Sequence, residues 1–594
     1  MNLVWAAVCI ILALAIVYYA PGYLRPQREN RPIAWAAPTF SFPGGYYDHD
    51  IQLSIKSPRP DAKVIFSMDG SVPTFTTATL YTQPLHLSVA MPVVIILRAR
   101  AVLSDTELGP VVSATYFLGV PAKLPLVSLI ISPSELWDPE YGLYVNPYER
   151  GIEWERSVDV TYVDQERDMG FHIAAGMRIH GGESRKFEKK PLRLYFREEY
   201  GSNRLIYSLF ADSEVQAFKR LILHSGGQDW YDTPLKNWTL IRNPLAARLA
   251  LDSGGYATYS QPVLLFINGE PWGIYQLRER PDEDFLADHY GIIEADFLES
   301  PGLSVQLPVI MGDRQHWDYL MNFVETHDLA DPTHYAYVRT QVNIENFINY
   351  NILQIYMANS DWPHHNVHQF RPRVVGGRWH WLLWDCDQGF GMYNDVNVNF
   401  VEKLLAYNNP ETQGQDTLLL RKLLANSEFR ARFIERSADL LNSTLASESV
   451  NAHIDALVGE LDADIIYEIL RWSSTVDWRS NIQDLHTFAN LRPDIVRQHI
   501  VESFDLDGTA PLTFCSPDNG TGIIMVNGTH VQDCPWQGLY FQGSSVRIRA
   551  VPSPGYRFAG WDAPSLSQNA VITHTVTGAQ TFTPRFVVAE NDGF

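Results

Sequence analysis

Short runs of alternating apolar and polar residues fill the chain from about Thr39 to Gly119. They include "DIQLSIKS", "AKVIFSMDG" and "VVIILRARAV", and Pro, Gly and Asp separate them. Alternation with a period of two predicts strands with one buried face, because successive side chains of a strand point to opposite faces. We therefore expect a small β-sandwich over residues 36–120.

A second series of alternating segments closes the chain, from about Asp507 to Phe594. It contains "GSSVRIRAVPSPGYRFAGWD" and "TFTPRFV", and it predicts an all-β module over residues 506–594. Its aromatic residues Tyr556 and Trp561 are expected in the core of a small sheet rather than on a sugar-binding surface. Cys515 and Cys534 either form a disulfide or remain free thiols, and the sequence leaves both readings open.

The body between these modules, residues 121–505, changes its pattern half-way. Its first half is rich in strands and includes the hairpin "QPVLLFINGEPWGIYQLRER", which turns at Asn268-Gly269. One helix, "TPLKNWTLIRNPLAARLALDSGG", interrupts the strands. From Ile344 onward, apolar residues recur three and four positions apart, which predicts helices. A β-rich part that leads into a helical part predicts a two-lobed α+β body.

An apolar stretch at the N-terminus, "LVWAAVCIILALAIVYYA", is long enough to cross a bilayer. Pro21 follows it and should block cleavage, so we expect an uncleaved transmembrane helix within residues 1–35. Arg25, Arg28 and Arg31 follow the span, which by the positive-inside tendency would leave the body in the cytoplasm. Long domains, however, are translocated largely regardless of flanking charge.

The composition restricts the class of partner. With 46% hydrophobic and 19% charged residues, the chain is an ordinary globular sequence. Its formal net charge of −22 argues against a nucleic-acid partner, because phosphate contacts need clustered Lys and Arg. A cationic partner or a metal-nucleotide complex remains compatible with this charge.

The segment "SDWPHHNVHQFRPRVVGGRWHWLLWDCDQGFG" collects acids around a Gly-Gly turn. In phosphoryl transfer from ATP, one acid receives the proton of the substrate hydroxyl, and an asparagine and a second acid hold the metal. Asp361 and Asn366 have the Asp-x4-Asn spacing of that order, and an apolar strand then leads into Asp385 and Asp387. The spacing alone is common, and Asp361 as a cap with Asn366 in a turn is the structural alternative.

Histidines in the same segment offer a different chemistry. His364 and His368 are four residues apart, an arrangement that binds zinc on a helix. Pro363 and the strand-like alternation that follows argue against a helix there, and therefore against a zinc hydrolase.

Ordered motifs of the body resemble the CotH family of kinase-like proteins. They include "LPLVSLII", "AAGMRIHGGESRKFEKKPLRLYFREEYG", "FINGEPWGIYQLRERPDEDFL" and the acidic segment. The resemblance implies a divergent protein-kinase-like fold that binds ATP with Mg²⁺ or Mn²⁺. It also implies phosphorylation of serines on secreted or coat proteins, the activity of characterised members.

The flanking segments carry their own resemblances. "IFSMDGSVPTFTTATLYTQPLHL" resembles the sandwich modules appended to chitobiases and other bacterial surface enzymes. The C-terminal segment resembles the short repeat modules of bacterial cell-surface proteins. Both kinds are typical of exported bacterial proteins, so we expect the body outside the cytoplasm.

By this resemblance, Asp361 would be the catalytic acid and Lys190 would bind the phosphates, with Lys189 as its close alternative. Asn366 and Asp385 would hold the metal, and Asp387 would be a second ligand. The remaining expected binding residues are Gly181, Gly182 and Ser184, in a loop that would cover the phosphates, and Glu279, with an inter-lobe or nucleotide-edge role. His180 stands where the family usually has an arginine, and Glu183 adds a negative charge beside the loop.

The expected fold class is multidomain: an α+β, two-lobed, divergent protein-kinase-like body flanked by all-β modules, with an N-terminal transmembrane helix. The expected function is a membrane-anchored extracytoplasmic kinase, which phosphorylates Ser or Thr of a secreted or cell-surface protein. The alternative is a surface scaffold or adhesion protein of the same fold, whose β-modules bind carbohydrate or protein. Presence of the whole set Lys190, Asp361, Asn366 and Asp385 favours the kinase.

Overall fold

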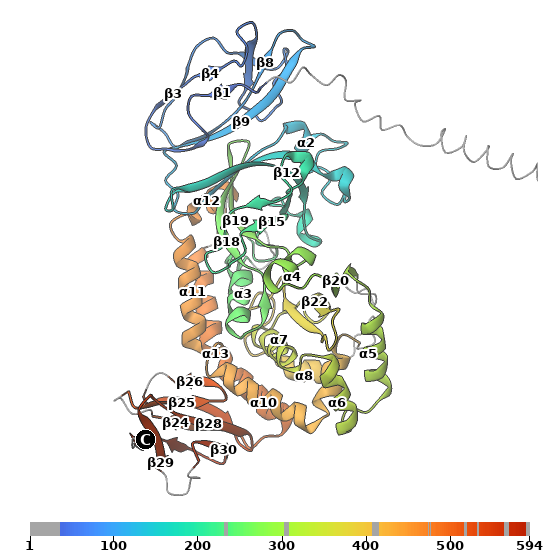
Figure 1. Ribbon diagram of the computed structural model, residues 1–594, viewed down its shortest axis with the longest axis vertical. Helices are drawn as coiled ribbons and strands as arrows, with labels where there is room; N and C mark the ends of the chain where they lie inside the picture. The colour runs from blue at the N-terminus through green and yellow to red at the C-terminus, as the bar shows by residue number, and fades with distance from the viewer. Residues whose placement is uncertain are drawn as a thin grey trace, which may run out of the picture.

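The computed structural model describes residues 36–230, 236–301, 308–406, 415–472, 474–475, 477–515, 520–531, 534–562 and 569–589. The predicted transmembrane helix lies in residues 1–35, outside the described residues. Among the helices of the described ranges, none combines the length and the apolar character that a membrane crossing requires. The molecule is elongated, with a β-module at each end and the body between them (Figure 1).

Strands make up the N-terminal module, as the alternation predicts. Its core contains Ile51, Leu53, Val64, Leu97 and Tyr116, all of them buried. The largest sheet has the order β2 (Gly45–Tyr47), β9 (Leu108–Leu118), β8 (Val93–Val102), β5 (Lys63–Ser67) and β6 (Thr79–Leu80). Two pairs complete the module: β1 (Thr39–Phe40) with β4 (Ile55–Lys56), and β3 (Ile51–Leu53) with β7 (Leu85–Leu87).

Buried polar contacts join this module to the body. Arg98 donates to Asp159 Oδ2 over 2.9 Å, and Ser113 Oγ donates to the same oxygen over 2.7 Å. The hydroxyl of Thr115 donates to the hydroxyl of Ser128 over 2.9 Å, and both residues are buried. The module is therefore packed against the body rather than attached only through a linker.

The strand-rich half of the body closes into a barrel. Its order is β10 (Leu126–Ile130), β11 (Arg156–Asp164), β12 (Met169–Ile179), β13 (Leu192–Tyr195), β16 (Arg220–His224), β19 (Glu270–Arg278) and β18 (Ser260–Ile267). Parallel pairing of β10 with β18 closes it. The hairpin predicted between β18 and β19 is confirmed, and Asn268 and Gly269 have φ of 51° and 84°, as a tight two-residue turn between twisted strands requires. A separate two-stranded sheet, β14 (Leu205–Ile206) with β15 (Ala217–Phe218), lies between β13 and β16 in the sequence.

The helical half of the body contains a five-stranded sheet. The sheet has the order β17 (Tyr256–Ala257), β23 (His380–Leu383), β22 (His365–Pro372), β20 (Ala295–Pro301) and β21 (Val309–Met311). The predicted hairpin around Gly376-Gly377 is the β22–β23 pair. The helices are α3 (Arg242–Asp252), α4 (Glu283–Tyr290), α5 (Gln315–Thr326), α6 (Pro332–Gln341), α7 (Ile344–Met357), α8 (Phe400–Leu405), α9 (Leu418–Leu424), α10 (Ser427–Leu441), α11 (Ser447–Leu461), α12 (Ile465–Trp472) and α13 (Trp478–Phe504).

Helix α3 begins later than its sequence predicts. The pattern placed a start at the Thr-Pro pair of residues 233–234, which lie outside the described residues; residues 236–241 are not helical, and the helix begins at Arg242. Asp229 causes the delay, because its carboxylate accepts from the backbone N–H groups of Thr239 and Arg242 over 2.6 and 3.1 Å. The guanidinium of Arg242 also pairs with Asp229. A buried carboxylate from outside the helix thus sets its first turn.

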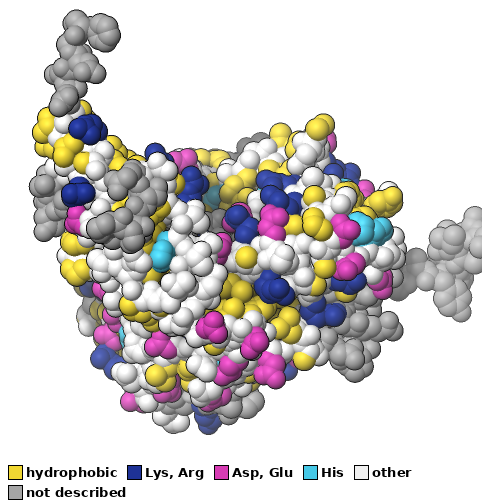
Figure 2. All heavy atoms as spheres, turned by 90° about the horizontal axis from the view of Figure 1, so that it is seen from below, with side chains coloured by type: hydrophobic (Ala, Val, Ile, Leu, Met, Phe, Trp, Pro, Cys, Tyr) yellow, Lys and Arg dark blue, Asp and Glu magenta, His cyan; other side chains and the backbone are white. Residues whose placement is uncertain are grey.

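Nine short strands form the C-terminal module: β24 (Thr509–Phe514), β25 (Gly522–Val526), β26 (Thr529–Val531), β27 (Trp536–Phe541), β28 (Ser545–Pro552), β29 (Tyr556–Trp561), β30 (Val571–Thr575), β31 (Gln580–Phe582) and β32 (Pro584–Val588), counted over the ranges given above. Trp561 is buried in its core, as predicted, and Tyr556 is half-buried. Cys515 and Cys534 form a disulfide, which decides between the two open readings. Seen from this end of the molecule, acidic and basic side chains are interspersed over the surface (Figure 2).

The C-terminal module docks on α10 through side-chain amides. Asn442 donates to the carbonyl of Leu539 over 2.8 Å, and Asn527 donates to Asp439 Oδ1 over 2.8 Å. Burial raises the pKa of Asp439 to about 7, although the bond from Asn527 and the charge of Arg436 oppose the shift. This interface therefore holds a carboxyl group that titrates near neutral pH.

We expect the stability of this interface to fall as the pH rises from about 4 to about 7. Asp439 has a pKa near 3.9 in an unfolded chain, so the folded chain binds the extra proton in that window, and the free energy of unfolding decreases with pH. Asp439→Asn should remove this pH dependence. At pH 8 its free energy of unfolding should exceed that of the parent by about 3 kcal/mol. Urea denaturation of the full chain at pH 5 and pH 8 measures it.

Asp484→Asn is the matched control, because Asp484 is an exposed carboxylate of α13. It should keep the pH dependence of the parent. An Asp439→Asn variant that loses stability between pH 5 and 8 as steeply as the parent would contradict the role given to Asp439.

Candidate functional site

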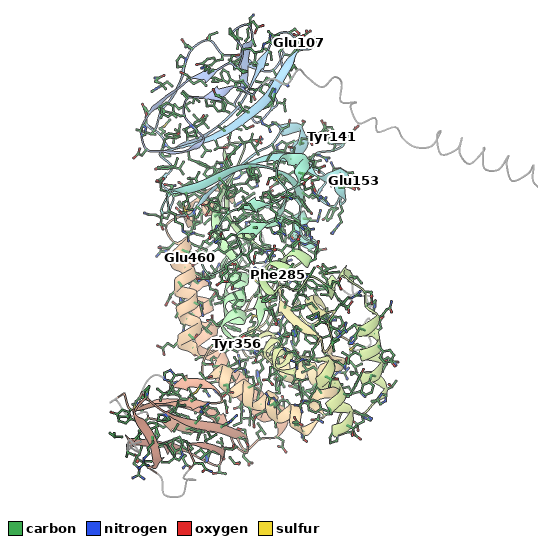
Figure 3. The ribbon with its side chains drawn as sticks, in the orientation of Figure 1. Glu107, Tyr141, Glu153, Phe285, Tyr356 and Glu460 are labelled. Carbon is green, nitrogen blue, oxygen red and sulfur yellow. A yellow bond between two sulfur atoms is a disulfide. The ribbon has the colours of Figure 1, made fainter. Side chains whose placement is uncertain are left out.

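A cavity of about 610 Å³ lies where the barrel meets the helical half of the body. The barrel side contributes basic side chains and the glycine-containing loop, while the other side contributes acids and histidines. The residues used below are Arg178, His180, Gly181, Gly182, Glu183, Ser184, Arg185, Arg193, Arg278 and Arg280 on the first side, and Glu299, Asp361, His365, Asn366, His368, Asp385 and Asp387 on the second. The segment between β10 and β11, on which Figure 3 labels Tyr141 and Glu153, adds Glu149, Arg150 and Gly151.

Local backbone structure brings Asp361 and Asn366 together. Helix α7 ends at Met357, and Asn359 Oδ1 then accepts from the N–H of Asp361 over 3.2 Å. Asn366 has a left-handed φ of 58°, which asparagine tolerates better than most residues. Its Nδ2 donates to Asp361 Oδ2 over 2.6 Å and to the carbonyl of Asp385 over 3.3 Å. The Asp-x4-Asn spacing thus corresponds to a direct contact.

His365 completes the environment of Asp361. Its Nδ1 lies 2.6 Å from Asp361 Oδ1, so both carboxylate oxygens of Asp361 are engaged. The hydrogen bond to Asp361 raises the pKa of His365, against the effect of burial. The zinc interpretation considered His364 and His368 on a helix, whereas residues 365–372 form strand β22. Sequence reasoning missed His365, although its place four residues after Asp361 was a usable signal.

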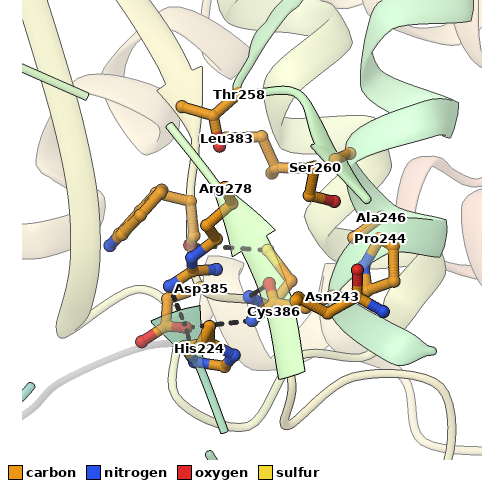
Figure 4. A pocket seen from close by; sticks show the side chains of 13 residues that line it. His224, Asn243, Pro244, Ala246, Thr258, Ser260, Arg278, Leu383, Asp385 and Cys386 are labelled. Atoms are coloured by element: carbon orange, nitrogen blue, oxygen red, sulfur yellow. Dashed lines mark hydrogen bonds and ion pairs between the residues drawn. The ribbon is translucent and has the colours of Figure 1, made fainter. Parts of the chain in front are cut away.

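Asp385 follows β23 in a left-handed conformation, with φ of 52°. Its Oδ1 accepts from Asn243 Nδ2 over 3.0 Å and lies 3.4 Å from the guanidinium of Arg278 and 3.5 Å from His224 Nε2 (Figure 4). Burial raises the pKa of Asp385, but the bond to His224 and the charge of Arg278 outweigh it and hold the pKa well below its usual range. Asp385 is therefore ionised at neutral pH.

The pKa of Asp387 is shifted in the opposite direction from that of Asp385. It is buried, and its Oδ2 accepts from the N–H of Gln228 over 2.6 Å. Burial and the charge of Asp385 raise the pKa of Asp387 well above its usual range. Gly227 packs against it with φ of 62°, and a Cβ there would lie 2.1 Å from Asp387 Oδ2, so this position requires glycine.

Arg185 holds the loop that follows β12. Its guanidinium is buried and donates to the carbonyls of Gly181, Ile179 and Pro147 over 2.6, 2.7 and 2.5 Å. The loop is thereby fastened both to its own strand and to the segment between β10 and β11. Gly181 itself has φ of 86°, a conformation that favours glycine.

Glu183 does not place an uncompensated charge beside the loop. Its side chain is 77% exposed and pairs with Lys186 over 2.6 Å. Ser184, the next residue, lines the cavity together with Gly181 and Gly182.

Lys190 and Lys189, the two lysines expected to bind the phosphates, are not among the residues that line the cavity. Lys190 Nζ donates to the carbonyls of Arg185 and Phe187 over 2.9 and 2.8 Å, so it fastens the loop from behind. Lys189 is fully buried and pairs over 2.7 Å with Glu468 of α12. Both ammonium groups thus already have fixed partners within the protein interior.

Glu279 also lies outside the lining of the large cavity. Its Oε2 accepts from the N–H of Tyr259 over 3.0 Å, and its Oε1 lies 2.7 Å from His289 Nε2 on α4. These contacts connect the end of β19 with α4.

Arginines take the place of lysines on the basic side of the cavity. Arg278 is 5% exposed, and its guanidinium lies 3.9 Å from the centre of the Trp384 ring. Arg178 pairs with Glu155 over 2.6 Å. Arg242, outside the cavity, likewise pairs with Asp229, and Arg278 lies 3.4 Å from Asp385.

Arg492 supports the acidic side from behind. It is fully buried in α13 and donates to the carbonyls of Ile355 and Tyr356 at the end of α7 over 2.8 and 2.9 Å. A cation at a helix C-terminus satisfies carbonyls that have no partner within the helix. Arg492 thus fixes the end of the helix that leads into Asp361.

Comparison with known families gives three matches. A model described as CotH kinase protein matches residues 177–496. A model of the chitobiase/beta-hexosaminidase C-terminal domain matches residues 42–113, and one of the divergent InlB B-repeat domain matches residues 525–590. These matches confirm the three resemblances that the motifs carry.

Comparison with individual proteins adds less. The crystal structure of the Helicobacter pylori proinflammatory kinase CtkA aligns with 50% of this chain and 94% of its own, at 12% identity and a TM-score of 0.21. No curated protein matches the chain.

Removing one partner of the Lys189–Glu468 pair should destabilise the protein strongly. Lys189→Met leaves the carboxylate of Glu468 buried without its cation, and losses of about 3–5 kcal/mol are typical of such changes. Replacing both residues, as Lys189→Met with Glu468→Leu, should recover much of the loss. Urea denaturation of the full chain measures both variants.

Lys186→Met is the control from the same segment, because Lys186 is 49% exposed and its ion pair lies at the surface. It should change the free energy of unfolding by less than about 1 kcal/mol. A similarly small loss for Lys189→Met would show that the buried pair does not hold the barrel to α12.

Proposed function

The chain belongs to the CotH kinase protein family, and on that premise we propose that it is a metal-dependent phosphotransferase. It would transfer the terminal phosphate of ATP to a Ser or Thr hydroxyl of a secreted or cell-surface protein. The observation that carries this proposal is the contact between Asp361 and Asn366 beside the ionised Asp385, in one cavity.

The acidic side fits a Mg²⁺ or Mn²⁺ ion by its donor set. The three contacts of Asp385 engage Oδ1, and its side chain is still 29% exposed, so Oδ2 is available as a ligand. Asn366 donates to Asp361 through Nδ2, so its amide oxygen Oδ1 would serve as the ligand to the ion. Oxygen ligands of this kind suit hard divalent cations.

Asp387 would be the second carboxylate ligand. Its raised pKa reflects burial and the nearby charge of Asp385, and a bound divalent cation would offset both. When bound, the ion would neutralise charge on the transferred phosphate.

Asp361 would accept the proton of the substrate hydroxyl. Hydrogen bonds from His365 and Asn366 fix its orientation and leave each oxygen one further lone pair. A positioned base of this kind commonly contributes about 10²–10⁴-fold to a rate.

The glycine-containing loop would lie over the phosphates. Gly181, Gly182 and Ser184 line the cavity opposite the acids, and backbone N–H groups of such a loop can bind anions. Lys190 and Arg185 would act indirectly, by holding the loop in place.

The location of this activity belongs to the proposal as well. A membrane anchor within residues 1–35, an extracytoplasmic body and a protein substrate remain proposals that rest on the apolar N-terminal stretch and on the two flanking modules. Carbohydrate binding by those modules would bring the protein to its substrate.

Two variants separate the proposed roles at the site. Asp385→Asn should weaken Mn²⁺-dependent ATP binding by about tenfold or more, because it removes a charged metal ligand. Asp361→Asn should bind ATP within about threefold of the parent and lose about 10²–10⁴-fold in phosphate transfer. Calorimetry with ATP and either metal measures binding, and labelled ATP with the protein itself and extracts of cell-surface proteins measures transfer.

Asp105→Asn is the control, because Asp105 is an exposed residue of the N-terminal module. It should leave both quantities unchanged. A folded parent protein that binds ATP with neither metal would refute the phosphotransferase and favour the scaffold alternative.

A further inference from the structure

Arg193 of β13 faces the cavity without a carboxylate partner among the described residues. Its guanidinium donates to His180 Nδ1 and, over 3.3 Å, to the hydroxyl of Tyr195. Its Nε is buried and has no hydrogen-bond partner. Arg193 thus presents a positive charge at the cavity wall, with Asp282 nearby but no carboxylate of the described residues within ion-pair distance.

The partners of Arg193 do not offset its charge. Burial, followed by the charge of Arg193 itself, lowers the pKa of His180 well below its usual range, so His180 is a neutral acceptor. Burial and the charge of Arg280 lower the pKa of Arg193 to about 10, which leaves it protonated at neutral pH. A half-buried cation that contacts no carboxylate is more favourable when a ligand supplies a negative charge beside it.

The other arginines of the cavity already have partners or are exposed. Arg178 and Arg278 have ion pairs with carboxylates, and Arg185 is bound by backbone carbonyls. Arg280 lies 3.8 Å from Asp282, and the exposed Arg150 donates to the carbonyl of Gly181 over 3.4 Å. Arg193 therefore differs from these arginines: it is half-buried, and its hydrogen bonds go to His180 and Tyr195 rather than to a carboxylate or a backbone carbonyl.

The strand register explains how Arg193 reaches this place. Arg193 pairs with Arg178 across β12 and β13, and the N–H of His180 donates to the carbonyl of Pro191 over 2.8 Å. The root of the loop at Gly181 and the guanidinium of Arg193 are thereby brought to the same edge of the barrel. Both face the acids across the cavity.

We propose that Arg193 is the phosphate-binding cation of this cavity and that it holds oxygens of the ATP phosphates through its guanidinium. A guanidinium has a fixed planar set of donors that matches phosphate oxygens. The assignment rests on the proposed function in so far as the ligand is a nucleotide. The chemistry that Arg193 recognises is a phosphate oxyanion, which inorganic tripolyphosphate also carries.

Calorimetry on the full chain with Mn²⁺, at constant ionic strength, tests this assignment with ATP, adenosine and tripolyphosphate as probes. Arg193→Gln should weaken the binding of ATP and tripolyphosphate by 10- to 100-fold, because a charge-assisted contact is lost, and leave adenosine binding within twofold. Arg197→Gln is the matched control, since Arg197 is 39% exposed, pairs with Glu155 and does not line the cavity. It should change none of the three affinities by more than twofold.

Arg193→Lys keeps the charge but not the planar donors, and it should weaken ATP binding by 3- to 10-fold. If circular dichroism shows that Arg193→Gln does not fold, ATP binding by Arg193→Lys tests the assignment instead. ATP binding that is unchanged in Arg193→Gln, or unchanged in Arg193→Lys where only that variant folds, would overturn the assignment. An equal loss for ATP and adenosine would also overturn it, because the effect would then not depend on phosphate.

Failure of the proposed function is distinguishable from failure of this inference. A parent that binds tripolyphosphate through Arg193 but not ATP would refute the nucleotide function and retain the phosphate site. A parent that binds ATP while Arg193→Gln binds it equally well would retain the function and refute Arg193 as the anchor. A folded parent that binds neither probe would overturn both.

Discussion

The buried ion pair between Lys189 and Glu468 is the contact on which the arrangement of the body depends. The two residues are 279 positions apart, and Glu468 also accepts from the backbone N–H of Ile274 over 2.7 Å and from Trp230 Nε1 over 3.0 Å. At Gly273, a Cβ would lie 2.3 Å from Glu468 Oε2. Strand β19 thus packs closely around the carboxylate of Glu468, which belongs to helix α12. The barrel side of the cavity is therefore held in place by a helix from the C-terminal part of the body.

This arrangement explains why the basic side of the cavity consists of arginines. Lys189 is committed to Glu468, and Lys190 is committed to the carbonyls that end the loop, so neither ammonium reaches the cavity. Arg193 enters instead from β13 and donates to His180, the residue that stands where related sequences usually have an arginine. In the proposed function, a metal-phosphate ligand would satisfy both sides of the cavity: its cation would offset the acids, and its phosphates would offset Arg193.

Local patterns were sufficient for much of the fold and for part of the candidate site. The Asn268-Gly269 hairpin depends on backbone conformations that those two residues favour, and the Asp361–Asn366 contact depends on a turn of six residues. The flanking β-modules likewise follow from short-range alternation. Each of these features is decided by neighbours in the sequence, so its signal is present in a short window.

Contacts between distant segments decided the rest. Whether Lys190 or Arg193 faces the cavity depends on how β13 sits in the closed barrel, and the start of α3 depends on Asp229, outside the helix. The role of Lys189 depends on a glutamate that only the folded chain brings near it. The amino-acid pattern specifies which elements form and which residue types are available. Packing decides which charged group is buried, which is paired and which is left to bind a ligand. The reason is that the energy of a charge depends on the partners that the whole fold places around it.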